Sequence, residues 1–299
     1  MANTADSARP VRRTRPTNAR PVNVGPLWAV PPLLVMAGVF FYPLSLIVGQ
    51  ALRGDFGPMT FGYFSRILGT AMFQNALLHT ISIAVAASLG CILLGFCLAL
   101  ILSFVPFPGA RMLARSIDTV IALPTFLVAL AFTFLYGSAG VFNLSLMQLF
   151  DLHAPPLDFL YSAWGVILAE VTVYTPFVMR PLLAAFSLID PAQIEVASSL
   201  GAKPWRITRQ IILPAALPAL LAGGSLCLLL TVNEFGIVLF IGAKGVITLP
   251  LMVYDKAIQE FDYTVGCTIA VINIVLSLAL YSLYRFVIAH FGGRRAGLV

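Results

Sequence analysis

The sequence has 299 residues, of which 60% are hydrophobic and only 10% are charged, and its mean hydropathy is +0.95. A soluble globular domain carries about 25% charged residues, so this composition excludes an ordinary soluble fold and indicates a protein that resides in lipid. The formal net charge is +6, but the basic residues do not form one patch, which argues against nucleic acid as a partner.

The two ends of the chain differ in composition from the middle. Residues 1–25 are rich in Pro, Arg and Ala without periodicity, which predicts a disordered basic cytoplasmic tail. The apolar run that follows is too long for a signal peptide and no convincing cleavage site ends it. We expect residues 26–74 to hold the first transmembrane helix and a periplasmic loop, residues 75–287 the main transmembrane domain, and residues 288–299 a cytoplasmic tail.

Six apolar segments are each long enough to cross about 30 Å of hydrocarbon as a helix of roughly 20 residues. The sequence therefore predicts an all-α, polytopic membrane protein with six transmembrane helices. Gly223 and Gly224, in the fifth segment, favour close packing between helices. The segments are Leu27–Gln50, Ala76–Val105, Thr119–Ala139, Leu160–Met179, Ala215–Ala243 and Tyr263–Tyr284.

The Lys and Arg residues of the connecting segments predict the orientation, because cytoplasmic loops carry an excess of them. With the N-terminus in the cytoplasm, most of the 18 basic residues fall inside. Both termini and the loop between the fourth and fifth segments are then cytoplasmic. The basic residues that remain outside are Arg53, Arg66, Lys244 and Lys256.

Two acidic residues interrupt the apolar segments, Glu170 in the fourth and Glu234 in the fifth. A carboxylate in a membrane helix is costly, so it normally faces a cavity or a partner. We predict that Glu170, Asn233 and Glu234 line a solute pathway. The alternative is that each acid is neutral or hydrogen-bonded between helices and holds the bundle together.

The cytoplasmic loop from Asp190 to Pro218 has helix signals of its own. Asp190 can cap a helix whose first residue is Pro191, and Ile194, Ala197 and Leu200 recur on one face. Gly201 is placed to end this helix with a positive φ angle. A second short helix is expected over Trp205–Leu213, ending before Pro214.

No catalytic or metal-binding pattern emerges from the sequence. The glycines and lysine of 242–245 lack the spacing of a phosphate-binding loop, so this chain is not expected to bind ATP. The three histidines fall in separate regions, and the four cysteines show no metal or disulfide spacing. We therefore expect no enzyme activity, no metal and no cofactor in this chain.

The loop carries a specific family resemblance. Glu195, Ala197 and Gly201, followed by Ile211, Leu213 and Pro214, resemble the EAA loop of permease subunits of bacterial ABC importers, with Val196 in place of the middle Ala. The resemblance implies that this loop is a coupling helix that docks on an ATP-hydrolysing subunit. An interfacial loop without a partner is the alternative. The residues implied in coupling are Glu195, Ala197, Ser198, Leu200, Gly201, Ile211, Leu213 and Pro214.

The resemblance extends from about Asn75 to Arg285, over the transmembrane domain of type I ABC importers. The stretches that begin at Phe41, Asp118 and Ala222 resemble permeases of bacterial 2-aminoethylphosphonate importers. Permeases for ferric iron, thiamine and polyamines share the fold, so those solutes remain alternatives. A secondary transporter has a similar helix count but no reason to carry the EAA pattern.

The resemblance implies a machine with several other parts. It implies ABC ATPase subunits that bind ATP and Mg, a periplasmic solute-binding protein, and a second permease subunit, expected to be a paralogue. The mechanism would be alternating access across the bacterial inner membrane.

Overall fold

The computed structural model describes residue 28, residues 30–54 and residues 57–291, and the side chains as far as residue 289. The tail predicted at residues 1–25 lies outside this range, as do residues 292–299 of the tail predicted at the C-terminus. The described part contains helices and no strands. The chain divides into two compact units, residues 1–46 and residues 47–299.

The first unit contains most of helix α1, Val30–Arg53, which continues into the second unit. Pro43 lies inside this helix. None of the described side chains of the first unit is buried within the chain. An apolar helical segment without buried side chains, as in this part of α1, is typical of a segment in contact with lipid.

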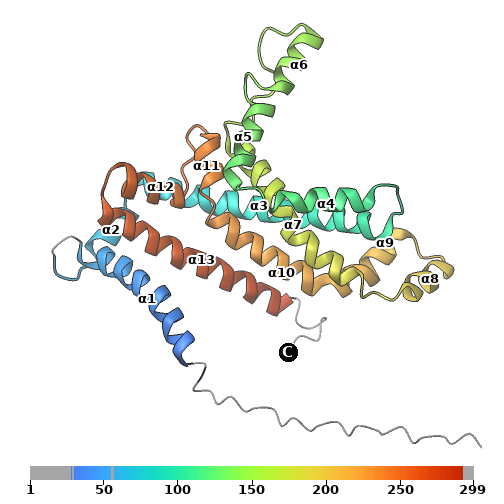
Figure 1. The fold of residues 1–299 in the computed structure, drawn as a ribbon, viewed down its shortest axis with the longest axis horizontal. Helices are drawn as coiled ribbons and strands as arrows, with labels where there is room; N and C mark the ends of the chain where they lie inside the picture. The colour runs from blue at the N-terminus through green and yellow to red at the C-terminus, as the bar shows by residue number, and fades with distance from the viewer. Residues whose placement is uncertain (1–27, 29, 55–56, 292–299) are drawn as a thin grey trace, which may run out of the picture. The chain divides into compact units, whose positions relative to one another are not determined.

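The second unit is built from helices of very different lengths. Four long helices, α3, α7, α10 and α13, run side by side, and shorter helices join them (Figure 1). The elements are α2 Gly62–Leu68, α3 Ala71–Phe104, α4 Ala110–Val120, α5 Thr125–Tyr136, α6 Val141–Phe150, α7 Ala163–Phe186, α8 Pro191–Ser199, α9 Pro204–Ile207, the π-helix η2 Thr208–Ile212, α10 Leu213–Val232, α11 Gly236–Ile241, α12 Leu249–Tyr254, the π-helix η3 Asp255–Gln259 and α13 Tyr263–Phe291.

The core lies where α3, α7 and α10 meet. Gly223 and Gly224 of α10 pack closely there, as predicted. A Cβ atom at Gly223 would lie 2.8 Å from the Cα atom of Val178, and one at Gly224 would lie 2.7 Å from Cδ1 of Ile92. Small residues therefore let the backbone of α10 approach its neighbours, as is common in membrane helix bundles.

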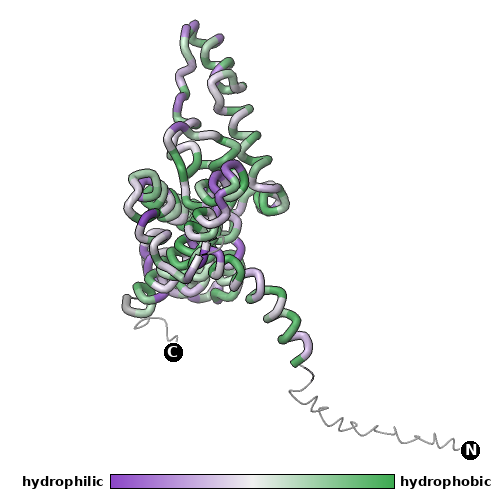
Figure 2. Tube along the Cα trace, turned by 90° about the vertical axis from the view of Figure 1, so that its left-hand side faces the viewer, coloured by the Kyte–Doolittle hydropathy of each residue, from purple (hydrophilic) through white to green (hydrophobic). Residues whose placement is uncertain are grey.

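Six helical segments of the described chain are long and apolar enough to cross a membrane, which confirms the predicted number. Hydrophobic residues predominate along α5 and α6, which rise from the long helices (Figure 2). The segments are Val30–Arg53, Ala71–Phe104, Thr125–Phe150, Ala163–Phe186, Pro204–Val232 and Tyr263–Ala289.

The predicted bounds of the third segment, Thr119–Ala139, were wrong. Helix α4 ends at Val120, and α5 begins only at Thr125, directly after Pro124. Proline lacks a backbone N–H and disfavours helical geometry in the residue before it, which explains the break. Helix α5 ends at Tyr136, and α6 then extends away from the long helices (Figure 1).

The predicted fifth segment, Ala215–Ala243, was also wrong at both ends. The helix begins in the loop at Pro204 and stops at Val232, and a short irregular stretch separates it from α11.

The domain boundary predicted at residue 75 falls inside α3, which begins at Ala71. Helix α13 continues as far as Phe291, past the boundary predicted at residue 288.

The two ends of the long helices carry different structures. Helices α8 and α9 lie at one end, and α2, α12 and η3 lie at the other (Figure 1). This separation places the 190–218 loop far from the segment that precedes α13. The long helices thus separate two different sets of short helices.

Candidate functional site

Helix α8 begins and ends with the capping residues that the sequence predicts. The Asp190 carboxylate accepts a hydrogen bond of 2.9 Å from the backbone N–H of Ala192, and Pro191 is the first helical residue. Gly201 has a φ angle of +80°, which confirms the predicted left-handed turn. Its N–H donates to the carbonyl of Ser198, and the N–H of Ala202 donates to that of Ala197. This pair of bonds is the Schellman motif, a rigid helix end.

Helix α8 partly buries one face and exposes the other. Ile194 and Ala197 pack against the core, whereas Val196 is 59% exposed. Leu200, the residue after the last helical one, is 83% exposed and lines the same groove as Ala197, whereas Ile194 does not line it.

A shallow, largely apolar groove of about 500 Å³ runs along this exposed face. Its lining joins α8 to the following helix, because Ile211 contributes to it. Glu195 and Ser198 are also exposed on α8. The surface thus combines apolar side chains with one carboxylate, a composition suited to a protein partner. The groove is lined by Ala192, Gln193, Val196, Ala197, Leu200 and Ile211.

The second short helix does not end before Pro214, contrary to the prediction. Helix α9 passes through the π-helix η2 into α10 without interruption, and the N–H of Leu213 donates to the carbonyl of Thr208, five residues earlier. In an α-helix the ring of Pro214 would meet the carbonyl of Gln210. The wider π-turn accommodates the proline, so the loop connects directly to a membrane helix.

Glu234 lies in the irregular stretch between α10 and α11, not inside a helix as predicted. Its side chain is 6% exposed. One carboxyl oxygen, Oε1, accepts a hydrogen bond of 2.8 Å from the backbone N–H of Ile237, in the first turn of α11. The other, Oε2, accepts a hydrogen bond from the hydroxyl group of Tyr174 on α7. Both oxygens are therefore engaged between elements of the protein.

Glu170 lies on the same face of α7 as Tyr174, four residues earlier. It begins the third turn of the helix, about 10 Å from Ala163 at 1.5 Å per residue, and not the 15 Å expected from a start at Leu160. Its side chain is 1% exposed, and its Oε2 atom has no hydrogen-bond partner among the described residues. Glu170 thus lies one helical turn from the tyrosine that is hydrogen-bonded to Glu234.

Sequence reasoning missed Tyr174, although its spacing from Glu170 offered a signal. A tyrosine one helical turn from a membrane acid is a natural hydrogen-bonding neighbour. What the sequence did not reveal is that the Tyr174 hydroxyl donates to Glu234, 60 residues further along the chain.

Asn233 has other partners than Glu170, Tyr174 and Glu234. Its Nδ2 donates to the carbonyl of Leu229 at 2.8 Å and to Oγ of Ser277 at 3.3 Å, and its Oδ1 accepts from Asn273 at 3.1 Å. The last two residues belong to α13. Asn233 therefore links the end of α10 to α13, whereas the adjacent Glu234 links it to α7.

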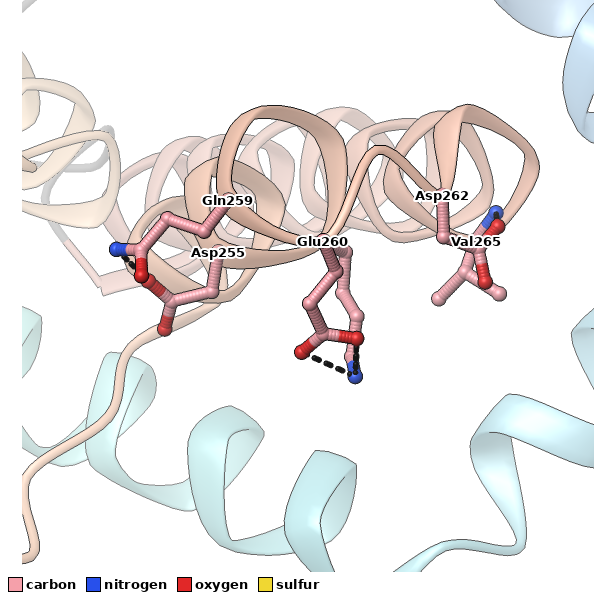
Figure 3. Close-up of polar contacts among 6 residues, drawn as sticks. Asp255, Gln259, Glu260, Asp262 and Val265 are labelled. Atoms are coloured by element: carbon pink, nitrogen blue, oxygen red, sulfur yellow. Dashed lines mark hydrogen bonds and ion pairs between the residues drawn. The ribbon is translucent and has the colours of Figure 1, made fainter.

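A second polar cluster lies in η3 and at the start of α13, at the end of the long helices away from α8 (Figures 1 and 3). Nζ of Lys256 forms an ion pair of 2.6 Å with Glu260, and Gln259 donates to Asp255 at 3.0 Å. Partial burial and the nearby Glu260 carboxylate raise the pKa of Asp255, and Lys256 opposes this shift. A pocket of about 390 Å³ beside the cluster includes Arg66 and Asp262 in its lining.

Residues 92–296 match the family of binding-protein-dependent transport system inner membrane components. The chain belongs to this family. Its members are permease subunits of ABC importers, so the protein is a multi-pass membrane translocation subunit and not an enzyme. Membership also implies an ATPase and a solute-binding protein as partners.

Individual relatives agree with this assignment. PhnU of Salmonella typhimurium, provisionally named the permease protein of a 2-aminoethylphosphonate transport system, is 61% identical over 277 residues, which cover 93% of this chain and 96% of PhnU. The sulfate transport system permease protein CysT of Escherichia coli is 29% identical over 269 residues, covering 89% of this chain and 92% of CysT.

Solved structures of more distant importers share the fold. A chain of a bacterial alginate ABC transporter superimposes with a TM-score of 0.70 at 18% identity, covering 88% of this permease and 93% of that chain. A chain of the MetNI methionine ABC transporter gives a TM-score of 0.54 at 18% identity, covering 72% and 94%. The similarity confirms the transmembrane architecture of an ABC importer.

Proposed function

We propose that this permease imports 2-aminoethylphosphonate across the bacterial inner membrane, with both termini in the cytoplasm. The assignment of this solute rests on the 61% identity to PhnU over nearly the whole of both chains. The relative with the sulfate name is much less similar. 2-Aminoethylphosphonate combines an ammonium group with a phosphonate, and the buried acids of this chain offer the charge that an ammonium group requires.

The α8 surface is the site at which we expect the ATPase to dock. Glu195, Ala197, Ser198, Leu200 and Gly201 contribute from α8 and its end, and Ile211, Leu213 and Pro214 from the start of the next membrane helix. A helix with a rigid Schellman end transmits a displacement, whereas a flexible loop would absorb it. The uninterrupted path from α9 through η2 into α10 supports this role, because motion of the loop reaches the core directly.

The rest of the machine follows from this assignment. Two ATPases bind ATP and Mg, while a second permease, expected to be a paralogue, completes the pore. The periplasmic binding protein delivers solute to the end formed by α2, α12 and η3. Glu170, Asn233 and Glu234 would lie on the solute pathway. Tyr174 and Ile237 each donate to one oxygen of Glu234 here, so release of Tyr174 would free accepting capacity on this carboxylate for the solute.

Solute uptake by reconstituted transporter tests the proposal. Liposomes with the ATPase, both permeases and the binding protein should accumulate labelled 2-aminoethylphosphonate only with ATP on the ATPase side. Excess unlabelled 2-aminoethylphosphonate should abolish uptake of the label, whereas sulfate, thiamine, ferric iron and spermidine should not. Uptake driven by a proton gradient without ATP, or preferential uptake of another solute, would contradict it.

A further inference from the structure

We propose that the hydroxyl group of Tyr174 is a switch that exchanges between two buried carboxyl groups, Glu234 and Glu170, during each transport cycle. Tyr174 is a positioning residue in this scheme, because it acts on the helices and not on the solute. The inference rests on the alternating-access function proposed above and names one contact that must break and re-form.

The first state of the switch is the one in this structure. Tyr174 on α7 holds Glu234, which in turn caps α11 through the N–H of Ile237. Together these two bonds tie the irregular stretch between α10 and α11 to α7. Releasing the hydroxyl group would remove this polar tie while leaving the α11 cap intact.

Helix α11 also packs against α5. A Cβ atom at Gly236 would lie 2.9 Å from Oγ1 of Thr125 and 3.6 Å from the backbone nitrogen of Phe126, so the start of α11 lies against the start of α5. The rings of Phe126 and Phe240 pack with centroids 5.3 Å apart. Helices α5 and α11 are therefore expected to move as a pair, and the Tyr174–Glu234 bond joins that pair to α7.

The second acceptor is Glu170, one helical turn before Tyr174. Tyrosine side chains in helices lean toward the N-terminal end of the helix, which brings the hydroxyl group over the turn that carries Glu170. Glu170 is 1% exposed, and its Oε2 has no partner among the described residues. A buried oxygen without a hydrogen bond is unfavourable, so Glu170 has unused capacity to accept this hydroxyl.

Exchange between the two acceptors needs no covalent step and no outside group. One hydrogen bond is lost at Glu234 and one is gained at Glu170, so the energies of the two states remain close. Such near balance is what a conformational switch requires, because a modest input from the coupling helix can then shift the populations. In the second state the polar contact between α7 and the stretch before α11 is absent, and Oε2 of Glu234 has lost its hydrogen bond from Tyr174.

The first experiment compares Tyr174→Phe with Tyr284→Phe in the complete reconstituted transporter. Tyr284 is a matched control, because its hydroxyl group also joins two helices, donating to the carbonyl of Leu221 at 3.1 Å. ATP hydrolysis is measured with and without the loaded binding protein, and thermal stability is measured on the same samples. Phenylalanine removes the hydrogen bond from both states and so keeps their balance, but the bond to Glu234 no longer has to break on leaving the first state. Unstimulated hydrolysis should therefore rise by about tenfold in Tyr174→Phe, and its stimulation ratio should fall accordingly. Tyr284→Phe should lower stability without changing that ratio.

The second experiment separates Glu170→Leu from Glu170→Gln. Leucine removes the acceptor at similar size, so the stimulated rate should fall by about tenfold. Glutamine keeps a carbonyl acceptor and should restore coupling to within about twofold of wild type. The double variant Tyr174→Phe with Glu170→Leu should behave as Tyr174→Phe alone, because Glu170 acts only through the hydroxyl group.

The outcomes distinguish this switch from the proposed function. Unchanged stimulation in Tyr174→Phe, equal effects of the two Glu170 variants, or additive effects in the double variant would each overturn the switch. If Tyr174→Phe does not assemble, the comparison of Glu170→Leu with Glu170→Gln still tests the switch. Failure of the wild-type transporter to show ATP-dependent uptake would instead overturn the proposed function.

Discussion

Gly223 of α10 packs directly against the backbone of Val178 on α7, where a Cβ atom would lie only 2.8 Å from the Cα atom. Gly223→Ala should therefore force the two helices apart and cost about 1–3 kcal/mol, the usual penalty for overfilling a packed core. The melting temperature of the purified permease in detergent measures this. Gly49→Ala is the control, because nothing lies within 4 Å of a Cβ atom there. Equal stability of the two variants would mean that the contact can relax.

Gly201 is constrained by its backbone and not by its surroundings. Its φ angle is +80°, and no atom lies within 4 Å of a Cβ atom there. Gly201→Val should cost about 1–2 kcal/mol at the helix end and disturb the α8 surface. We expect normal membrane insertion but loss of ATPase association or of stimulation by the loaded binding protein. Gly201→Asn should be milder, because asparagine tolerates this conformation. Normal transport by the valine variant would show that the turn is not needed for coupling.

The charge of Glu234 can be separated from its capping role. Glu234→Gln keeps the shape of the side chain and an oxygen that can accept from Ile237. If the charge contacts a cationic group of the solute, it contributes about 1.5–3 kcal/mol, so uptake at limiting solute should fall by about tenfold or more. The isolated binding protein should keep its affinity. Near-normal uptake, with protein level measured in the same membranes, would remove Glu234 from the pathway.

Glu234→Ala provides the complementary measurement. It also removes the acceptor for the N–H of Ile237, and loss of a helix cap costs about 1 kcal/mol. The alanine variant should therefore melt at a lower temperature than the glutamine variant. Equal melting temperatures would indicate that the cap contributes little to stability.

The orientation can be tested by cysteine labelling from outside intact cells with the outer membrane permeabilised. A membrane-impermeant maleimide should reach His153→Cys and Lys244→Cys, both exposed in the structure, and should miss Lys203→Cys. The wild-type chain serves as the background, since its four cysteines lie in membrane-spanning helices. Labelling at position 203 from the periplasm would reverse the orientation derived from the basic residues.

Asp255 should give a small pH-dependent effect on stability. Burial and the Glu260 carboxylate raise the pKa of Asp255, so its charged form costs stability above the raised pKa, and the cost disappears as the pH falls through it. Asp255→Asn, which keeps an acceptor for Gln259, should therefore melt slightly above wild type near pH 7.5 and equal it near pH 4. Because the group is partly exposed, we expect less than about 1 kcal/mol, decreasing with salt. A larger gain at low pH than at neutral pH would contradict the sign.

The sequence by itself determined the membrane class, the number of spanning helices and the caps of α8. Those properties depend on the length of apolar runs and on residues a few positions apart, such as Asp190 with Pro191, or the glycine that ends the helix at 201. Such local patterns can be predicted from the sequence because each one stabilises its own segment. The family resemblance of the 190–218 loop depends on the same short-range spacing.

Tertiary structure alone decided where the fifth helix breaks and which residues surround the buried acids. The apolar run continues past Asn233, so hydropathy predicts one span, but Glu234 ends α10 by capping α11 and meeting Tyr174. The sequence also did not predict the backbone at Pro214, where a π-turn accommodates the proline ring and the helix continues. In both places the outcome depends on backbone geometry or on a partner 60 residues away, and no local pattern in an apolar sequence specifies which distant side chain will satisfy a buried polar group.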